Sequence, residues 1–240
     1  MDLLAPLGFQ ESATGLTSDS ILAGPRRLLD LLNVKYLVAT TWNRGASALA
    51  SRPDRFRLVF SDASVRVFEN RTVLPRAFLV PASGARVISD ESAQLARVSD
   101  AAFEPAAEVV VGSAADIGGS SGGAPAADRQ AAPPRVLERG IQSIRVRVDA
   151  PQAGVLVLSQ AYYPGWVAAV DGRETPALRV DFGLAGVAVA PGPHEVLFRY
   201  APRYLRIGAM LTIASLICAA ACWLAPRRIS SRRERPTTSA

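Results

Sequence analysis

The side chains best suited to contact a ligand gather in one stretch, at Tyr162, Tyr163, Trp166 and Asp171. Aromatic faces can stack on the apolar side of a pyranose ring, and an acidic side chain in a loop can contact sugar hydroxyls. These four residues are therefore the candidate glycan-contact site. A structural interpretation also accounts for them, because aromatic residues anchor the cores of β-domains and Asp171-Gly172 favours a hairpin turn. The structural interpretation is favoured, and the other stays open.

The sequence contains few other residues that could bind a metal, bind a phosphate or catalyse a reaction. His194 is the only histidine, and the two cysteines, Cys218 and Cys222, lie in an apolar C-terminal run. A metal site rich in histidine and cysteine is therefore excluded from the soluble part. His194 follows Pro191-Gly192-Pro193 at the start of a predicted strand, which favours a structural role over catalysis. The glycine-rich residues 118–123 have no following lysine, so they do not form a phosphate-binding loop. We expect no catalytic residue, no metal and no cofactor.

The positive charge is concentrated at one end of the chain. The formal net charge is +6, Lys35 is the only lysine, and five arginines lie within Arg227–Arg235. Without these arginines most of the chain is close to neutral, and no other basic patch is interleaved with aromatic residues. The sequence therefore indicates no nucleic-acid partner.

An uncharged apolar run from Ile207 to Ala225 precedes those arginines. At about 1.5 Å per residue, a helix of this run nearly crosses a hydrocarbon core of about 30 Å. We predict a transmembrane helix over residues 205–225, with the lipid bilayer as its partner. By the positive-inside rule, the basic tail of residues 226–240 is cytoplasmic. The preceding domain is then extracytoplasmic, at the plasma membrane.

The first residues do not explain how such a domain reaches the outer side. The segment MDLLAPLGFQES has neither the basic region nor the apolar core of a signal peptide. We therefore expect earlier transmembrane helices of a parent polypeptide to carry the domain across. Small residues on one face of the apolar run, Gly208, Thr212, Ser215 and Ala219, permit close packing against such helices.

Composition divides the soluble part into three segments. Residues 1–111 predict a small α/β segment, with helices over 24–33 and 91–98. Residues 112–134 carry few large apolar side chains, which predicts a flexible linker. Residues 135–202 predict an antiparallel β-sandwich, so the fold class is mainly β. Strands are expected at 34–40, 56–60, 65–68, 77–80, 108–111, 144–148, 155–158, 166–170, 177–180, 187–189 and 196–200.

Alternation and turn residues support the β-sandwich prediction. Ile144, Val146 and Val148 alternate with polar residues, a pattern typical of a half-buried antiparallel strand. Turn-forming pairs separate the later strands: Pro164-Gly165, Asp171-Gly172 and Pro191-Gly192.

Several short motifs, in a fixed order, resemble one known family. They are Tyr162-Tyr163-Pro164-Gly165-Trp166, Val170-Asp171-Gly172, Gly186-Val187, Pro191-Gly192-Pro193-His194-Glu195-Val196 and Phe198-Arg199-Tyr200-Ala201-Pro202, followed by the apolar run. Three upstream motifs look like the same family's preceding segments: Leu31-Leu32-Asn33-Val34-Lys35-Tyr36-Leu37-Val38, Val67-Phe68-Glu69-Asn70 and Leu74-Pro75-Arg76-Ala77-Phe78. Together they resemble the C-terminal region of the bacterial YfhO-type membrane proteins.

This resemblance implies a polytopic protein similar to GT-C-type glycosyltransferases, which use polyprenyl-phosphate-linked sugars to glycosylate envelope polymers. The catalytic acid of such enzymes lies in an early extracytoplasmic loop that has no counterpart in this sequence. We therefore expect an accessory domain and membrane anchor that is not catalytic alone, with an envelope glycan as candidate partner. The alternative is a structural, membrane-tethered interaction module from a split or truncated gene.

Overall fold

The computed structural model describes residues 27–42, 44–118 and 132–224. The chain forms two compact units, Met1–Ala201 and Pro202–Ala240, which are described separately. Most of the predicted linker and the whole of the predicted tail, residues 226–240, lie outside the described residues.

The first unit contains a five-stranded antiparallel sheet with the order β11-β10-β14-β8-β7. The alternation predicted for β8 (Ser143–Ala150) is confirmed, because Ile144, Val146 and Val148 are buried while Arg147 between them is exposed. Pairing of β8 with β14 extends from Ser143 opposite Arg199 to Ala150 opposite Gly192. The strands are β7 (Arg135–Arg139), β8 (Ser143–Ala150), β10 (Trp166–Val170), β11 (Arg173–Thr175) and β14 (Gly192–Tyr200).

A six-stranded sheet with the order β4-β9-β13-β12-β6-β5 faces it. Its strands come from both sides of residues 112–134, so one sheet crosses the predicted linker. Only its β5–β6 pair is parallel. The strands are β4 (Ala77–Pro81), β5 (Ala85–Val87), β6 (Val109–Val111), β9 (Gly154–Ala161), β12 (Leu178–Val180) and β13 (Leu184–Val189).

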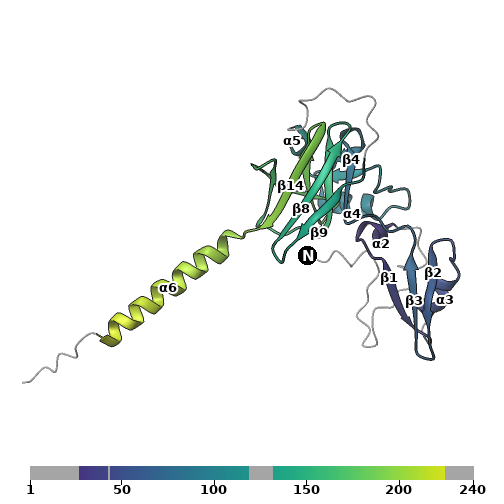
Figure 1. Ribbon diagram of the computed structural model, residues 1–240, viewed down its shortest axis with the longest axis horizontal. Helices are drawn as coiled ribbons and strands as arrows, with labels where there is room; N and C mark the ends of the chain where they lie inside the picture. The colour runs from purple at the N-terminus through teal and green to yellow at the C-terminus, as the bar shows by residue number, and fades with distance from the viewer. Residues whose placement is uncertain (1–26, 43, 119–131, 225–240) are drawn as a thin grey trace, which may run out of the picture. The chain divides into compact units, whose positions relative to one another are not determined.

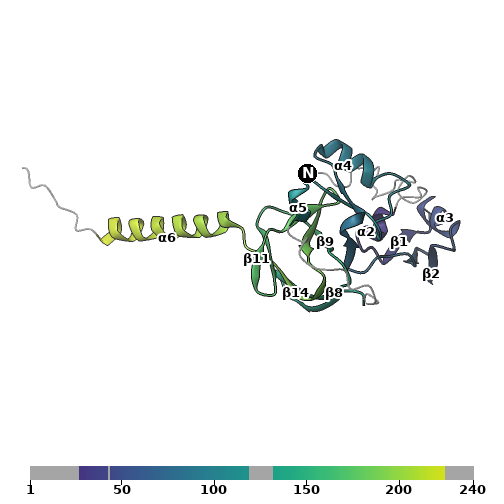
Figure 2. The same cartoon turned by 90° about the horizontal axis from the view of Figure 1, so that it is seen from above.

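The two sheets enclose a core of small and branched apolar side chains. Phe198 of β14 and Leu156 of β9 are among its buried members, and Figure 2 shows the two layers with β8 and β14 on one side and β9 on the other. The predicted mainly β, antiparallel architecture is confirmed. Inward side chains of this core are Ile144, Val146, Val148, Leu156, Leu158, Ala168, Ala185, Val187, Val189, Val196 and Phe198.

The six-stranded sheet is buried on its other face as well. Residues Gly154 to Ser159 of β9 are all buried, so the apolar run at this strand does not alternate. Val155 and Val157 pack into a second core, which also contains residues of the N-terminal helices and strands. Helix α4 (Glu91–Val98) lies over the same sheet, and its N-terminus is capped by the Asp90 side chain.

A smaller antiparallel sheet with the order β1-β3-β2 completes the first unit (Figure 1). Leu49 of α3 (Arg44–Ala50) and Phe68 of β3 are buried in the second core, together with Leu31 of α2 (Leu28–Leu31). The strands are β1 (Tyr36–Thr40), β2 (Phe56–Ser61) and β3 (Val65–Asn70), and the shorter helices η2 (Ala82–Gly84) and α5 (Ala115–Gly118) belong to later segments.

A buried carboxylate joins the small sheet to α2. The Asp30 carboxylate accepts hydrogen bonds from Asn70 Nδ2 at 2.7 Å and from Thr72 Oγ1 at 3.0 Å. The Arg55 guanidinium lies 3.2 Å from the same carboxylate. Both members of the Arg55–Asp30 ion pair are shielded from water, so removing either charge would leave the other buried without its counter-charge.

The described part of the second unit forms the helix α6 (Arg203–Leu224), of 22 residues. No charged residue occurs from Ile207 to its end, and its described apolar side chains are exposed. Among the described residues, no helix combines the length and the apolar character needed to cross a membrane. The transmembrane assignment of residues 205–225 stays a prediction.

Candidate functional site

Strand β10 separates the predicted site residues instead of gathering them. Trp166 begins this strand and Asp171 directly follows its end. At about 3.3 Å per residue, the five steps between them span about 16 Å. The aromatic residues and the aspartate therefore lie at opposite ends of the β-sandwich and do not line one pocket.

At the aromatic end, most of the ring surface is used for packing. Trp166 and Tyr162 pack against the core between the two sheets, and Trp166 also contacts Tyr200, with ring centroids 5.5 Å apart and planes tilted by 53°. Gly165 provides the bend with a φ of 114°, and its carbonyl accepts a hydrogen bond from the Ala201 amide at 2.7 Å. Tyr163, with 57% of its surface exposed, is the aromatic residue of this group best placed to meet a ligand.

At the other end, Asp171-Gly172 forms the two-residue turn that joins β10 to β11. Val170 is paired with Arg173 across the turn, and both turn residues have positive φ, 51° for Asp171 and 80° for Gly172. This geometry matches the right-handed twist of the flanking strands, which explains the aspartate-glycine sequence.

The Asp171 carboxylate is held by the neighbouring strand β14. Its Oδ1 accepts the Glu195 amide hydrogen at 2.8 Å, and its Oδ2 lies 2.7 Å from His194 Nδ1. These contacts lower the pKa of Asp171, the Glu195 amide having the larger effect and the His194 hydrogen bond the next. The aspartate is therefore a stable anion at neutral pH.

Both ring nitrogens of His194 face acceptors. Nδ1 faces the Asp171 carboxylate, and Nε2 lies 3.0 Å from the backbone carbonyl of Ala190. The ring is therefore held from both sides. This arrangement supports a structural role for this histidine.

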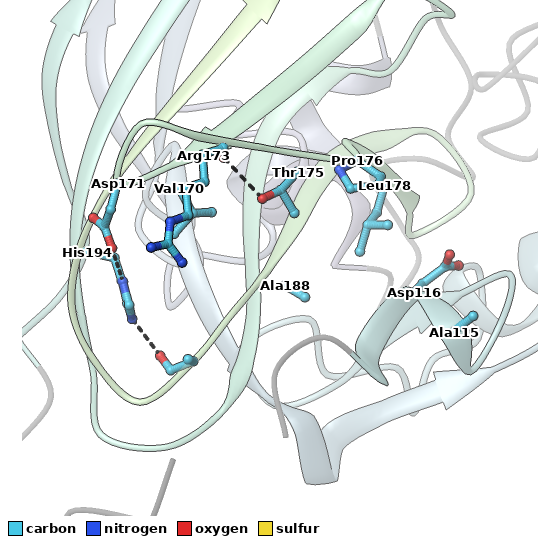
Figure 3. A pocket seen from close by; sticks show the side chains of 11 residues that line it. Ala115, Asp116, Val170, Asp171, Arg173, Thr175, Pro176, Leu178, Ala188 and His194 are labelled. Atoms are coloured by element: carbon cyan, nitrogen blue, oxygen red, sulfur yellow. Dashed lines mark hydrogen bonds and ion pairs between the residues drawn. The ribbon is translucent and has the colours of Figure 1, made fainter. Parts of the chain in front are cut away.

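A cavity of about 720 Å³ opens beside this turn (Figure 3). Asp171 and His194 lie on one side of it and Asp116 of α5 on the opposite side, with Arg173 extending between them. Within the part of the chain that the structure describes, the Arg173 side chain makes no hydrogen bond or ion pair. The residues that line the cavity are Ala115, Asp116, Val170, Asp171, Arg173, Thr175, Pro176, Leu178, Ala188, Ala190 and His194.

This cavity can bind a polar ligand, but its described groups do not form a catalytic set. The Arg173 guanidinium, the Thr175 side chain and two carboxylates offer donors and acceptors beside apolar side chains. No described group of three His, Cys, Asp or Glu side chains is placed to hold a metal ion. Sequence reasoning found Asp171 but missed Arg173 and His194 as its neighbours. The aspartate-glycine turn was the available signal, since it places residue 173 opposite residue 170.

The fold defines a class of protein: an antiparallel β-sandwich whose last strand leads, through Ala201 and Pro202, into an apolar helix. The family model for the bacterial membrane protein YfhO matches residues 126–212. The chain is similar to this membrane-protein family over these residues, which make up less than half of its length. No curated protein matches the chain, and no solved structure matches it.

Proposed function

We propose that this chain is an extracytoplasmic accessory domain with its membrane anchor, a C-terminal piece of a polytopic, glycosyltransferase-like envelope protein. The observation that carries the proposal is the extent of the family match. Residues 126–212 include the strands from β7 to β14 and continue into α6. A match that extends from the sandwich into the helix supports one functional unit made of both.

The composition of α6 supports its role as the anchor. Between Ile207 and Leu224 its isoleucine and leucine side chains each favour membrane insertion by roughly 0.3 to 0.6 kcal/mol, and no charge opposes them. The arginines of the sequence Arg227–Arg235 favour the cytoplasmic side for the C-terminus. The exposed apolar side chains of the helix include Met210, Leu211, Ile213, Leu216 and Ile217.

The chemistry of the described residues supports a domain with no transfer activity of its own. Glycosyl transfer needs a base beside the acceptor and stabilisation of the departing phosphate. His194 is occupied at both nitrogens, and Asp171 is bound to Glu195 and His194. Arg173 is a single cation, whereas a lipid-linked phosphate also requires a groove among several membrane helices.

The test is an assay of the purified chain with polyprenyl-phosphate-linked sugar and an envelope acceptor. We expect no product above the blank. Product that forms with the chain and disappears in the Asp171→Asn variant would contradict the non-catalytic proposal and the structural role of that aspartate.

A second candidate function is glycan binding without catalysis. The cavity beside Asp171, with Arg173 in its lining, favours a ligand with polar groups. Titration of envelope glycan fragments, followed by nuclear magnetic resonance shifts, tests both ends of β10. Shifts that are lost in Arg173→Ala would place the glycan in the cavity, and shifts lost in Tyr163→Ala would place it at the aromatic end. The alternative of a purely structural, tethered interaction module predicts shifts at neither end.

A further inference from the structure

Among the described residues, none covers one apolar face of the small sheet. In the register of its strands, Val38 of β1 lies opposite Val67 of β3, and Val67 lies opposite Phe60 of β2. Directly opposed residues point to the same side of a sheet, so these three side chains form one row across all three strands. Val38 is 70% exposed and Phe60 is 53% exposed. Helix α3 does not cover this row, because Leu49 packs with Phe68, whose side chain points to the other face.

A second row on the same face combines an aromatic ring with an ion pair. Tyr36 lies opposite Glu69, and Glu69 lies opposite Arg57, whose guanidinium is 2.6 Å from the Glu69 carboxylate. The Lys35 ammonium lies 5.4 Å from the centre of the Tyr36 ring. The row therefore places cations and an amphipathic ring at one end of the apolar face.

Trp42 stands at the other end. The Thr41 amide donates to the Ser64 carbonyl at 2.9 Å, which fixes this segment beside the turn between β2 and β3. Trp42 itself is 76% exposed. Contact of so large an apolar side chain with water is unfavourable in free energy. Tryptophan and tyrosine in exposed positions are typical of side chains that lie at membrane interfaces.

The charge around this face favours an anionic surface. Residues 35–71 contain seven cationic side chains and three acidic ones, Asp54, Asp62 and Glu69, and the charge of Arg55 is balanced by Asp30, so the net charge is +3. Each lysine or arginine near an anionic bilayer adds to the electrostatic attraction between the protein and the bilayer. The two ends of the face thus carry the aromatic residues, and its surroundings carry the excess of positive charge.

We propose that this face, made of Tyr36, Val38, Trp42, Phe60 and Val67, docks on the anionic headgroup region of a lipid bilayer. The apolar side chains and the exposed tryptophan can contact the acyl chains of a bilayer, and the surrounding cationic side chains can contact its anionic headgroups. This contact is additional to the anchor proposed for α6 and does not use any of its residues.

The test uses the full chain reconstituted into vesicles of phosphatidylcholine with or without phosphatidylglycerol, containing lipid with a quencher near the headgroup. The chain has three tryptophans, so the double variant Trp166→Phe/Trp223→Phe leaves Trp42 as the only one. We expect its fluorescence to shift to shorter wavelength and to be quenched in the anionic vesicles, with less quenching in neutral vesicles and at high salt. If the double variant does not fold, Trp166 is kept and its signal is subtracted with Trp42→Phe.

Two further variants distinguish docking from a general effect. Val38→Asp places a charge in the middle of the face and should abolish the quenching of Trp42. Ile141→Asp is the matched control, because Ile141 is equally apolar and fully exposed in the turn between β7 and β8, outside the face. It should leave the quenching unchanged.

Trp42 that stays unquenched and accessible to iodide in anionic vesicles would overturn the proposal. Trp42 that is shielded from iodide but not quenched by lipid would also overturn it, because another protein surface or a second copy would then cover the face. The companion variant Trp42→Phe/Trp166→Phe reports on Trp223 of α6. If Trp223 is quenched and Trp42 is not, docking of the face is overturned and anchoring by α6 is supported. If Trp42 is quenched and Trp223 is not, docking of the face is supported and anchoring by α6 is contradicted.

Discussion

His194 of β14 holds Asp171 of the β10–β11 turn across a sequence separation of 23 residues, with Nδ1 2.7 Å from Oδ2. The same carboxylate accepts the amide of Glu195, so one side chain fixes the tip of one hairpin to the start of the neighbouring strand. This contact also forms one wall of the cavity in Figure 3.

The Asp171 contact predicts a stability that falls in acid. The folded pKa of Asp171 lies below its ordinary value, so the carboxylate stabilises the fold above that ordinary value. This contribution is lost as the pH falls through the lowered folded pKa. Asp171→Asn should reduce the free energy of unfolding by about 1 kcal/mol at neutral pH, a typical value for a hydrogen bond, and by less in acid. Urea unfolding at both pH values measures the difference, and an equal loss at both would contradict the account.

The buried Asp181 side chain predicts a contribution to stability that becomes less favourable as the pH rises. This side chain is fully buried, its Oδ1 accepts the Val110 amide at 2.8 Å, and its Oδ2 has no partner in the described structure. Burial is the main cause that raises the pKa of Asp181 to about 7. Because the folded pKa is raised, the carboxylate costs stability progressively as the pH rises from its ordinary value, and the full cost is present above the folded pKa.

The variant Asp181→Asn removes that cost while keeping an oxygen for the Val110 amide. Asparagine also tolerates the positive φ of 47° at this position. We expect the variant to be more stable than the original chain above about pH 7, by a few kcal/mol, since one pKa unit corresponds to about 1.4 kcal/mol. The advantage should shrink toward about pH 4. A variant whose advantage does not change with pH would show that the group is not titrating as described.

Loss of the Asp30 side chain, at the centre of the cluster of Asp30, Arg55, Asn70 and Thr72, should strongly reduce the free energy of unfolding. Asp30→Ala removes an acceptor that Arg55, Asn70 and Thr72 share, and with it the buried negative charge that faces the Arg55 guanidinium. We expect a loss of about 3–5 kcal/mol in the free energy of unfolding. The matched control is Glu104→Ala, which breaks an exposed ion pair with Arg27 and should cost less than about 1 kcal/mol. Similar losses in the two variants would contradict the structural importance of the cluster.

At the aromatic end of the sandwich, two variants distinguish a residue that packs in the core from a residue that is exposed to a ligand. Trp166→Ala should lower the melting temperature, because it removes a ring that packs on the core and on Tyr200, at a cost of about 2 kcal/mol. Tyr163→Ala should leave the melting temperature almost unchanged, since most of that side chain is exposed. Thermal unfolding of both variants checks this, and the reverse order would mean that Tyr163 is the packing residue.

Local patterns were sufficient to predict much of the sandwich. The strand at Trp166–Val170, the helix at Glu91–Val98 and the turn at Asp171-Gly172 were each predicted from adjacent residues, and each is present. The strand Gly154–Ala161 was predicted too short, because the apolar pattern marked only its centre.

Non-local arrangements could not be derived from those patterns. Strand β7 was missed because Arg135–Arg139 is exposed throughout and has no apolar side chain in the core. The inclusion of β4, β5 and β6 in the larger sheet depends on pairing with strands far away in sequence. For the same reason, the contact of His194 with Asp171 and the separation of Asp171 from the aromatic residues required the structure.

The orientation of the sandwich is tested most directly by labelling cysteines in intact cells. Ile141→Cys, in a fully exposed turn, marks the sandwich, and Thr237→Cys marks the C-terminal tail, each in a chain with Cys218 and Cys222 changed to alanine and expressed in its native genomic context. With a maleimide that cannot cross membranes, we predict labelling at position 141 in intact cells and at position 237 only after the membrane is opened. Labelling at position 237 in intact cells, with position 141 protected, would contradict an extracytoplasmic sandwich anchored by α6.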